Sequence, residues 1–64
     1  MLDDIDKALL RSLQADGRLS NVELARKVNL SPPATHTRLK RLERDGYIRQ
    51  YAAIVDREKA GYDL

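Results

Sequence analysis

The chain has 64 residues, twelve basic and ten acidic side chains, one histidine and no cysteine, and its formal net charge is +2. A chain of this length forms one small domain, and without cysteine it has neither a disulfide framework nor a thiolate metal site. No apolar run reaches the roughly 18 residues of a membrane span, and the acidic start "MLDDIDK" is unlike a basic secretory signal, so we expect a cytoplasmic protein without membrane contact.

Charge is unevenly distributed along the chain. Residues 1–17 carry a net charge of −2, whereas residues 18–49 carry eight basic and three acidic side chains, a net charge of +5. Residues 50–64 return to −1. A basic centre between acidic ends favours a polyanionic partner, although a charged run is equally compatible with an ordinary solvated surface.

The first predicted helix runs from about Asp4 to Ala15. Asp3 is a good N-cap residue, and Asp6 adds negative charge near the positive end of the helix dipole. The apolar stripe at helical spacing consists of Ile5, Leu9 and Leu13, with Ala8 and Leu10 beside it. The sequence "ADGR" ends the helix, and Gly17 is expected to take the left-handed conformation there.

The second predicted helix runs from Asn21 to about Val28 and follows the sequence "SNVE". Ser20 and Glu23 have the spacing of a capping box at its start. Asn29 comes next, and asparagine is one of the few residues besides glycine that tolerates a positive φ in a tight turn. Leu30 is expected to fill the angle between this helix and the next one.

The third predicted helix covers about residues 32–44, and "DG" ends it. Ser31 is placed as its N-cap, and two prolines follow. Proline suits a helix start because the first backbone N–H groups have no partner within the helix. Because a residue before proline avoids helical geometry, Pro32 can lie just outside, with Pro33 as the first helical residue. The expected inward stripe is Thr35, Leu39 and Leu42, with Arg38 at its edge.

Residues 47–55, "YIRQYAAIV", are rich in β-branched and aromatic side chains and predict a strand with apolar groups on both faces. An unpaired strand of this kind favours pairing with another chain. We therefore expect a homodimer formed through the 47–55 strand. The expected contacts are Ile48, Tyr51, Ala53 and Val55. A short turn or helix capped by Asp56 should follow.

Two short helices joined by a turn of about three residues match a helix-turn-helix unit. Ala25 supplies its small residue, and Val28 and Leu30 supply the apolar residues around the turn. Thr35 and Arg38 depart from the generic motif, which has apolar residues at both positions. The predicted fold is mainly α: a three-helix, winged-helix-like helix-turn-helix domain followed by one C-terminal β-strand and a short turn or helix.

Over essentially all 64 residues the sequence resembles the N-terminal domain of the Lrp/AsnC (leucine-responsive, or feast/famine) family of bacterial and archaeal transcription regulators. The segments that carry the resemblance are "LDDID…LL..LQ.DGR", "LSP", "R.KRLE..G.I" and "Y.A.VD..K.G". Arginine at position 38 is common in that family. The resemblance implies a helix-turn-helix domain over 1–47 and a linker strand and turn over 48–64. A ligand-sensing domain, with its amino-acid effector site, would begin where this chain stops.

The resemblance also implies sequence-specific binding of double-stranded DNA, with the helix of about residues 32–44 as the recognition helix in the major groove. The residues expected nearest the base edges are Pro33, His36, Thr37 and Lys40. Those expected nearer the phosphates are Arg38, Arg41 and Arg44, together with Ser20 and Ser31 at helix starts. The residue types fit independently, because base reading needs exposed hydrogen-bonding groups and flanking cations neutralise phosphates.

Other roles remain open for some of these residues. Arg38 can instead pair with a carboxylate of the first or second helix, such as Asp16 or Glu23. His36 is the only histidine, so a DNA contact or a plain surface position is favoured over a catalytic or metal-binding role. The alternative function is a helix-turn-helix module for protein association or dimerisation without DNA binding. We expect no enzyme activity and no cofactor.

Overall fold

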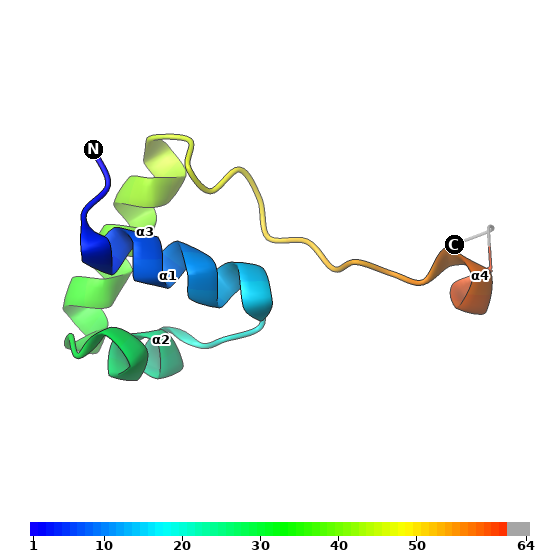
Figure 1. The fold of residues 1–64 in the computed structure, drawn as a ribbon, viewed down its shortest axis with the longest axis horizontal. Coiled ribbons are helices and arrows are strands. Elements are labelled where there is room, and N and C mark those ends of the chain that lie inside the picture. The colour runs from blue at the N-terminus through cyan, green and yellow to red at the C-terminus, as the bar shows by residue number, and fades with distance from the viewer. Residues whose placement is uncertain (62–64) are drawn as a thin grey trace.

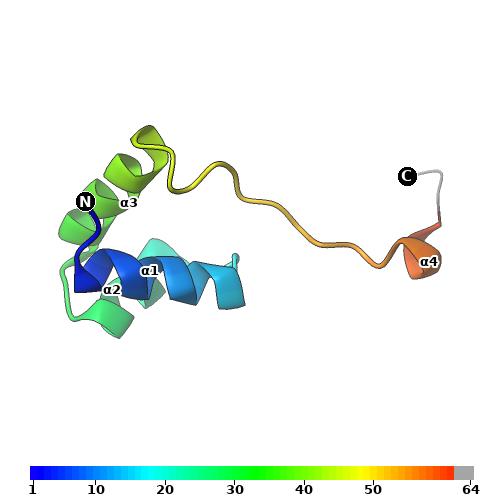
Figure 2. The ribbon, with the colours of Figure 1, turned by 45° about the horizontal axis from the view of Figure 1, so that its top comes forward.

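A computed structural model describes residues 1–61, in which three helices pack together and a fourth lies apart. The helices are α1 (Asp4–Ala15), α2 (Asn21–Val28), α3 (Pro32–Arg44) and the short α4 (Arg57–Ala60). In Figure 1 an extended segment runs from the end of α3 to α4, away from the three-helix body. Figure 2 confirms from a second side that α3 is steeply inclined to α1 and α2. The first three helices have the predicted bounds.

The hydrophobic core lies where α1, α2 and α3 meet, and it is small. Leu9, Leu24 and Leu39, one from each helix, form the buried cluster. The partly buried residues around it are Ile5, Leu13, Leu19, Val28 and Ile48. Each buried leucine contributes roughly 1.5–3 kcal/mol relative to an exposed one, so a handful of side chains holds α3 in place. No helix within residues 1–61 is long and apolar enough to cross a membrane.

Side chains cap the starts of α1 and α2. Asp3 Oδ1 accepts a hydrogen bond from the backbone N–H of Asp6 at 2.8 Å, and Asp6 Oδ2 accepts one from Asp3 N–H at 3.2 Å. Ser20 and Glu23 make the same reciprocal pair, at 3.1 and 3.0 Å. The predicted capping box of α2 is therefore confirmed. At α1 the capping role of Asp3 is confirmed, and Asp6 completes a second box.

The two interhelical turns differ in how they end the preceding helix. Asn29 has φ +58° and caps α2 in the left-handed conformation, as predicted. The prediction for Gly17 was wrong, because the positive-φ residues of the described chain are Asn29, Gly46 and Gly61. The α1–α2 turn is instead closed by Asp16, whose Oδ1 accepts a hydrogen bond from Arg18 N–H at 3.0 Å. That side-chain bond removes the need for a left-handed glycine.

Pro32 is the first residue of α3, the candidate recognition helix, and does not lie outside it. Ser31 is the N-cap, with φ −70° and ψ 153°, and its hydroxyl accepts a hydrogen bond from Ala34 N–H at 3.3 Å. The extended geometry that proline imposes on its predecessor is met at Ser31. Pro32 takes helical geometry although Pro33 follows it, so both prolines lie in the first turn, where a missing N–H costs nothing.

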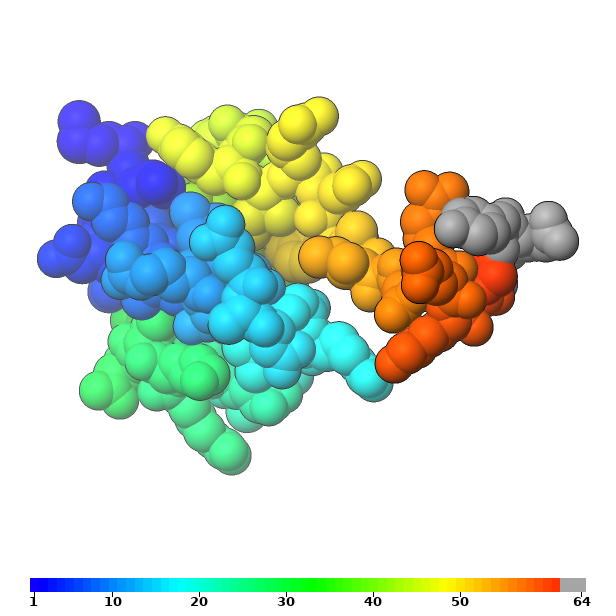
Figure 3. All heavy atoms as spheres, turned by 45° about the vertical axis from the view of Figure 1, so that its right-hand side comes forward, coloured from blue at the N-terminus to red at the C-terminus, as the bar shows by residue number. Residues whose placement is uncertain are grey.

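The strand predicted over 47–55 is not confirmed, because no strand occurs within residues 1–61. Gly46 ends α3 with φ +85°, and the N–H groups of Tyr47 and Ile48 both donate to the carbonyl of Leu42, at 3.0 and 3.1 Å. Beyond Ile48 the backbone has no neighbouring strand with which to form a ladder, and a ladder defines a strand. Figure 3 shows the following residues and α4 as a projecting arm.

Residues 47–55 are called the exit segment from here on. The short turn or helix predicted after it is a helix, α4. Asp56 is the N-cap of α4, and its Oδ1 accepts a hydrogen bond from Lys59 N–H at 3.1 Å. Residues 62–64 of the segment predicted over 48–64 lie outside the described residues.

Candidate nucleic-acid interface

One side of α3 is buried and the opposite side is open, as its sequence predicts. The buried residues of α3 are Thr35, Leu39 and Leu42. The exposed residues on the other side include Pro33, His36, Thr37, Lys40 and Arg44. The buried residues therefore fix α3 in the fold, while its opposite side exposes polar and cationic groups.

Thr37 and His36, near the start of α3, differ in which of their hydrogen-bonding groups remain available to a ligand. The Thr37 hydroxyl donates to the carbonyl of Pro33 at 3.1 Å, so its proton is used within the helix while its oxygen can still accept. His36 is exposed and makes no hydrogen bond within the described chain, so its ring nitrogens have no partner there. A donor and an acceptor on adjacent exposed residues are the chemistry that base edges recognise.

Arg38 is turned toward α1. Its Nη1 lies 2.6 Å from Asp3 Oδ2 and 3.2 Å from Asp6 Oδ1, and its side chain is only 24% exposed. The hydrogen bond from Arg38, helped by that from Asp6 N–H, lowers the pKa of Asp3 to about 2, and the same contact raises the pKa of Arg38. The structural role left open for Arg38 is therefore the one observed, with Asp3 and Asp6 in place of Asp16 or Glu23.

Arg41 shares the buried carboxylate of Asp6. Its Nη2 lies 3.7 Å from Asp6 Oδ2, while the Asp6 side chain is 2% exposed and that of Arg41 is 48% exposed. Two guanidinium groups and one backbone N–H thus surround a carboxylate that has almost no access to water. Arg41 stands at the open edge of this cluster, so most of its charge remains available to an external anion.

Lys40 and Arg44 are the most accessible cations of α3. Lys40 Nζ lies 3.5 Å from Glu43 Oε1, and its side chain is 62% exposed. Arg44 Nε lies 3.3 Å from Asp45 Oδ1 at the exposed end of the helix. Exposed pairs of this kind contribute little to stability and exchange readily with other ions. Both cations can therefore bind phosphate without breaking a structural contact.

Ser20 and Ser31 cap the starts of α2 and α3, and a hydrogen bond from Asn21 connects these two helix starts. Ser20 and Ser31 each use a hydroxyl lone pair to cap a helix, which leaves the hydroxyl proton to donate to an anion. Asn21 Nδ2 donates to the carbonyl of Pro32 at 2.9 Å, so the first residue of α2 is bound to the first residue of α3. Sequence reasoning missed Asn21, whose contact depends on how the two helices cross.

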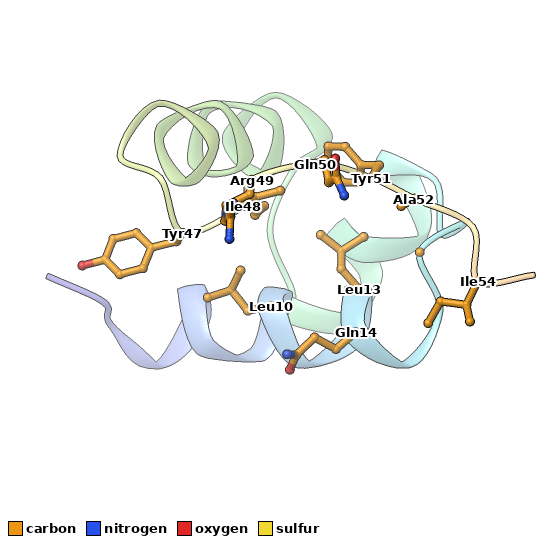
Figure 4. Close-up of a pocket in the computed structure, with 11 residues that line it drawn as sticks. Leu10, Leu13, Gln14, Tyr47, Ile48, Arg49, Gln50, Tyr51, Ala52 and Ile54 are labelled. Carbon is orange, nitrogen blue, oxygen red and sulfur yellow. The ribbon is translucent and has the colours of Figure 1, made fainter.

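The expected dimer residues divide into two groups. Ile48 packs against the core of its own chain. Tyr51, Ala53 and Val55 are exposed, and Tyr51 OH donates to Glu43 Oε2 at 2.8 Å. Between α1 and this exit segment lies an open groove of about 750 Å³. In Figure 4, Leu10 and Leu13 of α1 point toward the exit segment across the groove, and Ile54 lies near its far end.

The exposed cations of α3 provide chemistry for binding an anion. Within residues 1–61 there is no group of three or more His, Asp or Glu side chains placed to hold a metal ion. Lys40, Arg41 and Arg44 are exposed, whereas Arg38 pairs with the carboxylates of Asp3 and Asp6.

Residues 2–49 match the sequence family described as winged helix-turn-helix DNA-binding. The leucine-responsive regulatory protein of Rhizobium meliloti is 49% identical over 63 residues, which are 98% of this chain and 40% of that protein. The structure of LrpC from Bacillus subtilis superposes with a TM-score of 0.87 and 44% identity, over 98% of this chain and 45% of that one.

A Neisseria meningitidis transcriptional regulator, solved as a complex with L-Met, superposes with a TM-score of 0.88 and 48% identity, over 94% of this chain and 39% of that one. The chain spans about 40% of the length of the curated relatives that it matches. The match of residues 2–49, the relatives and the superpositions agree: this chain belongs to the winged helix-turn-helix DNA-binding family and, within it, to the Lrp/AsnC transcription regulators.

Proposed function

We propose that this chain binds double-stranded DNA sequence-specifically, as the DNA-binding domain of a transcription regulator, with α3 in the major groove. The observation that carries the proposal is the division of α3 into a buried apolar side and an open side with Lys40 and Arg44. A groove-reading helix needs this division, because the core must fix the helix while its polar side meets the bases. The proposal includes a cytoplasmic location, because the DNA that the protein would bind lies there.

The residues of the open side take different roles in this proposal. Base edges are read by Pro33, His36, Thr37 and Lys40. Phosphates are bound by Arg41, Arg44, Ser20 and Ser31. Arg38 contributes mainly by fixing α3 against α1, since two carboxylates occupy its guanidinium group. The outward cations of α3 favour DNA over the alternative of a protein-association module, because a polyanion gains most from such a surface.

We further propose that the chain dimerises through residues 47–55, which become a strand when paired with a second copy. The exposed apolar side chains of the exit segment and the groove beside α1 support this, since both would be covered in a dimer. Pairing would also give the extended backbone the ladder that it lacks in one chain. A two-fold dimer implies DNA half-sites about one helical turn, or a multiple of it, apart.

The boundary of the DNA-binding domain is proposed at residue 47, with residues 48–64 as the connection to a further domain. The relatives are more than twice as long as this chain, and one related regulator was solved with L-Met. We therefore propose that the whole protein responds to an amino acid, bound outside this chain.

Fluorescence anisotropy of a labelled random-sequence duplex, titrated with this chain over a range of salt concentrations, tests the DNA-binding role. We expect affinity to fall steeply with salt, with about 0.9 units of log–log slope for each phosphate contact. If binding is absent at low salt, the same titration is repeated with two copies of the chain joined by a flexible linker. Absence of binding there would refute the DNA role and favour protein association.

A further inference from the structure

Tyr51 of the exit segment is connected to the open side of α3 through Glu43. The Tyr51 hydroxyl donates to Glu43 Oε2 at 2.8 Å, and Glu43 Oε1 lies 3.5 Å from Lys40 Nζ. Glu43 is the only acidic residue of α3. A single carboxylate therefore lies between the segment that leaves the domain and a cation proposed to contact DNA.

A carboxylate at this position opposes DNA binding in two ways. Glu43 lies three residues after Lys40 and seven after His36, which places it on the same flank of the helix. It would repel the DNA backbone and would also neutralise Lys40 if the two groups came together. The strength of both effects depends on the position in which the Glu43 side chain is held.

The bond from Tyr51 is the stronger of the two contacts that Glu43 makes. A hydroxyl bonded to a carboxylate at 2.8 Å is charge-assisted, whereas the ion pair to the exposed Lys40 is long and weak. The Tyr51 bond is the main cause that lowers the pKa of Glu43, while burial and then this bond raise the pKa of Tyr51 to about 12. At neutral pH the carboxylate is thus ionised and the phenol protonated, as the bond requires.

We propose that Tyr51 is a positioning residue for DNA binding: it holds the Glu43 carboxylate toward the exit segment, so that the ion pair between Glu43 and Lys40 stays long and weak and Lys40 can exchange it for DNA. This inference rests on the proposed DNA-binding function. Its consequence is that the conformation of residues 47–55 affects DNA affinity directly, because a movement that withdraws Tyr51 lets Glu43 move closer to Lys40 and strengthens their ion pair.

A double-mutant cycle tests the proposal, using this chain and the labelled random-sequence duplex. Tyr51→Phe removes the hydroxyl and keeps the ring, and Glu43→Gln removes the charge. We expect Tyr51→Phe to weaken DNA binding by about three- to tenfold, the effect of losing one exposed hydrogen bond. Glu43→Gln should strengthen binding, and the double variant should bind like Glu43→Gln alone.

Tyr47→Phe is the matched control. Tyr47 lies in the same segment, is 49% exposed, and its hydroxyl makes no hydrogen bond within the described chain, so its removal should leave DNA affinity unchanged. Unfolding midpoints, measured by circular dichroism for every variant, separate stability from binding. The double variant keeps the test decisive if Tyr51→Phe is less stable, because a merely destabilised domain would bind weakly with or without Glu43.

Three results would overturn the inference. Equal affinity of the wild type and Tyr51→Phe would refute the role of Tyr51 while leaving the DNA-binding function intact. A double variant that retains the full loss of Tyr51→Phe would show that Tyr51 acts by a route other than Glu43. A wild-type chain that binds no duplex, alone or as linked copies, would remove the proposed function and this inference together.

Discussion

Arg38 of α3 and Asp3, the N-cap of α1, form an ion pair with 2.6 Å between Nη1 and Oδ2, although they lie 35 positions apart in the sequence. Asp6 adds a second contact to the same nitrogen at 3.2 Å. The capping box that starts α1 is thus also the site that holds the middle of α3. Stability of the fold and orientation of the proposed recognition helix consequently depend on the same two carboxylates.

This ion pair should make stability depend on acid pH. Folding lowers the pKa of Asp3 from 3.8 to about 2, mainly through the hydrogen bond from Arg38, so the folded protein binds this proton less readily than the unfolded chain. The stabilisation is therefore complete above the unfolded pKa and is lost as pH falls through about 4 toward 2. Thermal unfolding midpoints measured across this range should fall more steeply for the wild type than for Asp3→Asn.

Asp4→Asn is the control for that experiment, because Asp4 carries the same charge in the first turn of α1. Its side chain is exposed and makes no hydrogen bond or ion pair within the described chain. The pH dependence of Asp4→Asn should resemble that of the wild type. If the two variants lose pH dependence equally, the effect comes from the helix dipole and not from Arg38.

Asp6→Ala should be among the most destabilising single substitutions in the chain. The carboxylate is 2% exposed, and its removal leaves Arg38 with one partner and Asp3 N–H without one. Breaking a buried ion pair from one side costs about 3 kcal/mol or more. Arg41→Ala, which removes a half-exposed partner at 3.7 Å, should cost less than about 1 kcal/mol. Urea unfolding of both variants checks this order, and equal losses would contradict it.

Much of this fold could be predicted because its signals are local. The start of α2 follows from Ser20 and Glu23, three residues apart, and its end from Asn29, which has φ +58°. These features need only the neighbouring backbone, so sequence spacing is enough to find them.

Contacts between distant residues could not be predicted in the same way. The partners of Arg38 and the bond from Asn21 to Pro32 depend on how the helices cross, and no spacing encodes that angle. The strand predicted over 47–55 is not confirmed for a different reason: β-propensity describes a side chain's preference, but a strand also needs a neighbouring strand. The bond from Tyr51 to Glu43 joins residues eight positions apart across the end of α3, so it too depends on the course of the chain in space.

Thr35→Val should stabilise the protein. Thr35 is 0% exposed, and its hydroxyl has no hydrogen-bond partner within the described chain. Replacing an unsatisfied buried hydroxyl by a methyl group of similar size removes a desolvation penalty of about 1–3 kcal/mol. A higher urea midpoint would confirm this. Thr37→Val, at an exposed position of the same helix, is the control and should change stability by less than about 0.5 kcal/mol. If Thr35→Val is instead destabilised, the Thr35 hydroxyl has a partner such as a buried water.

Val55→Asp should weaken self-association if residues 47–55 pair between two chains. Val55 is exposed and is not part of the hydrophobic core of its own chain, so a carboxylate there should not disturb the three-helix body. In a dimer the introduced carboxylate would be taken out of water among apolar side chains of the partner, and a buried charge without a partner opposes pairing. Sedimentation equilibrium measures the change in mass, and Ala60→Asp, which adds the same charge at an exposed position beyond the segment, is the control. An unchanged mass distribution for Val55→Asp would contradict pairing through this segment.

His36→Ala and Arg44→Ala should separate base reading from phosphate binding on α3. Arg44 is an exposed cation near the end of the helix, so its loss should weaken binding to every duplex and reduce the log–log salt slope by about 0.9. His36 is exposed and lies nearer the helix start, so its loss should reduce the ratio of affinities for the selected site and a random duplex. The salt slope should stay the same. Anisotropy titrations on both duplexes measure the two quantities independently, and Arg11→Ala on α1 is the control. Equal losses for His36→Ala on both duplexes would make that residue a backbone contact.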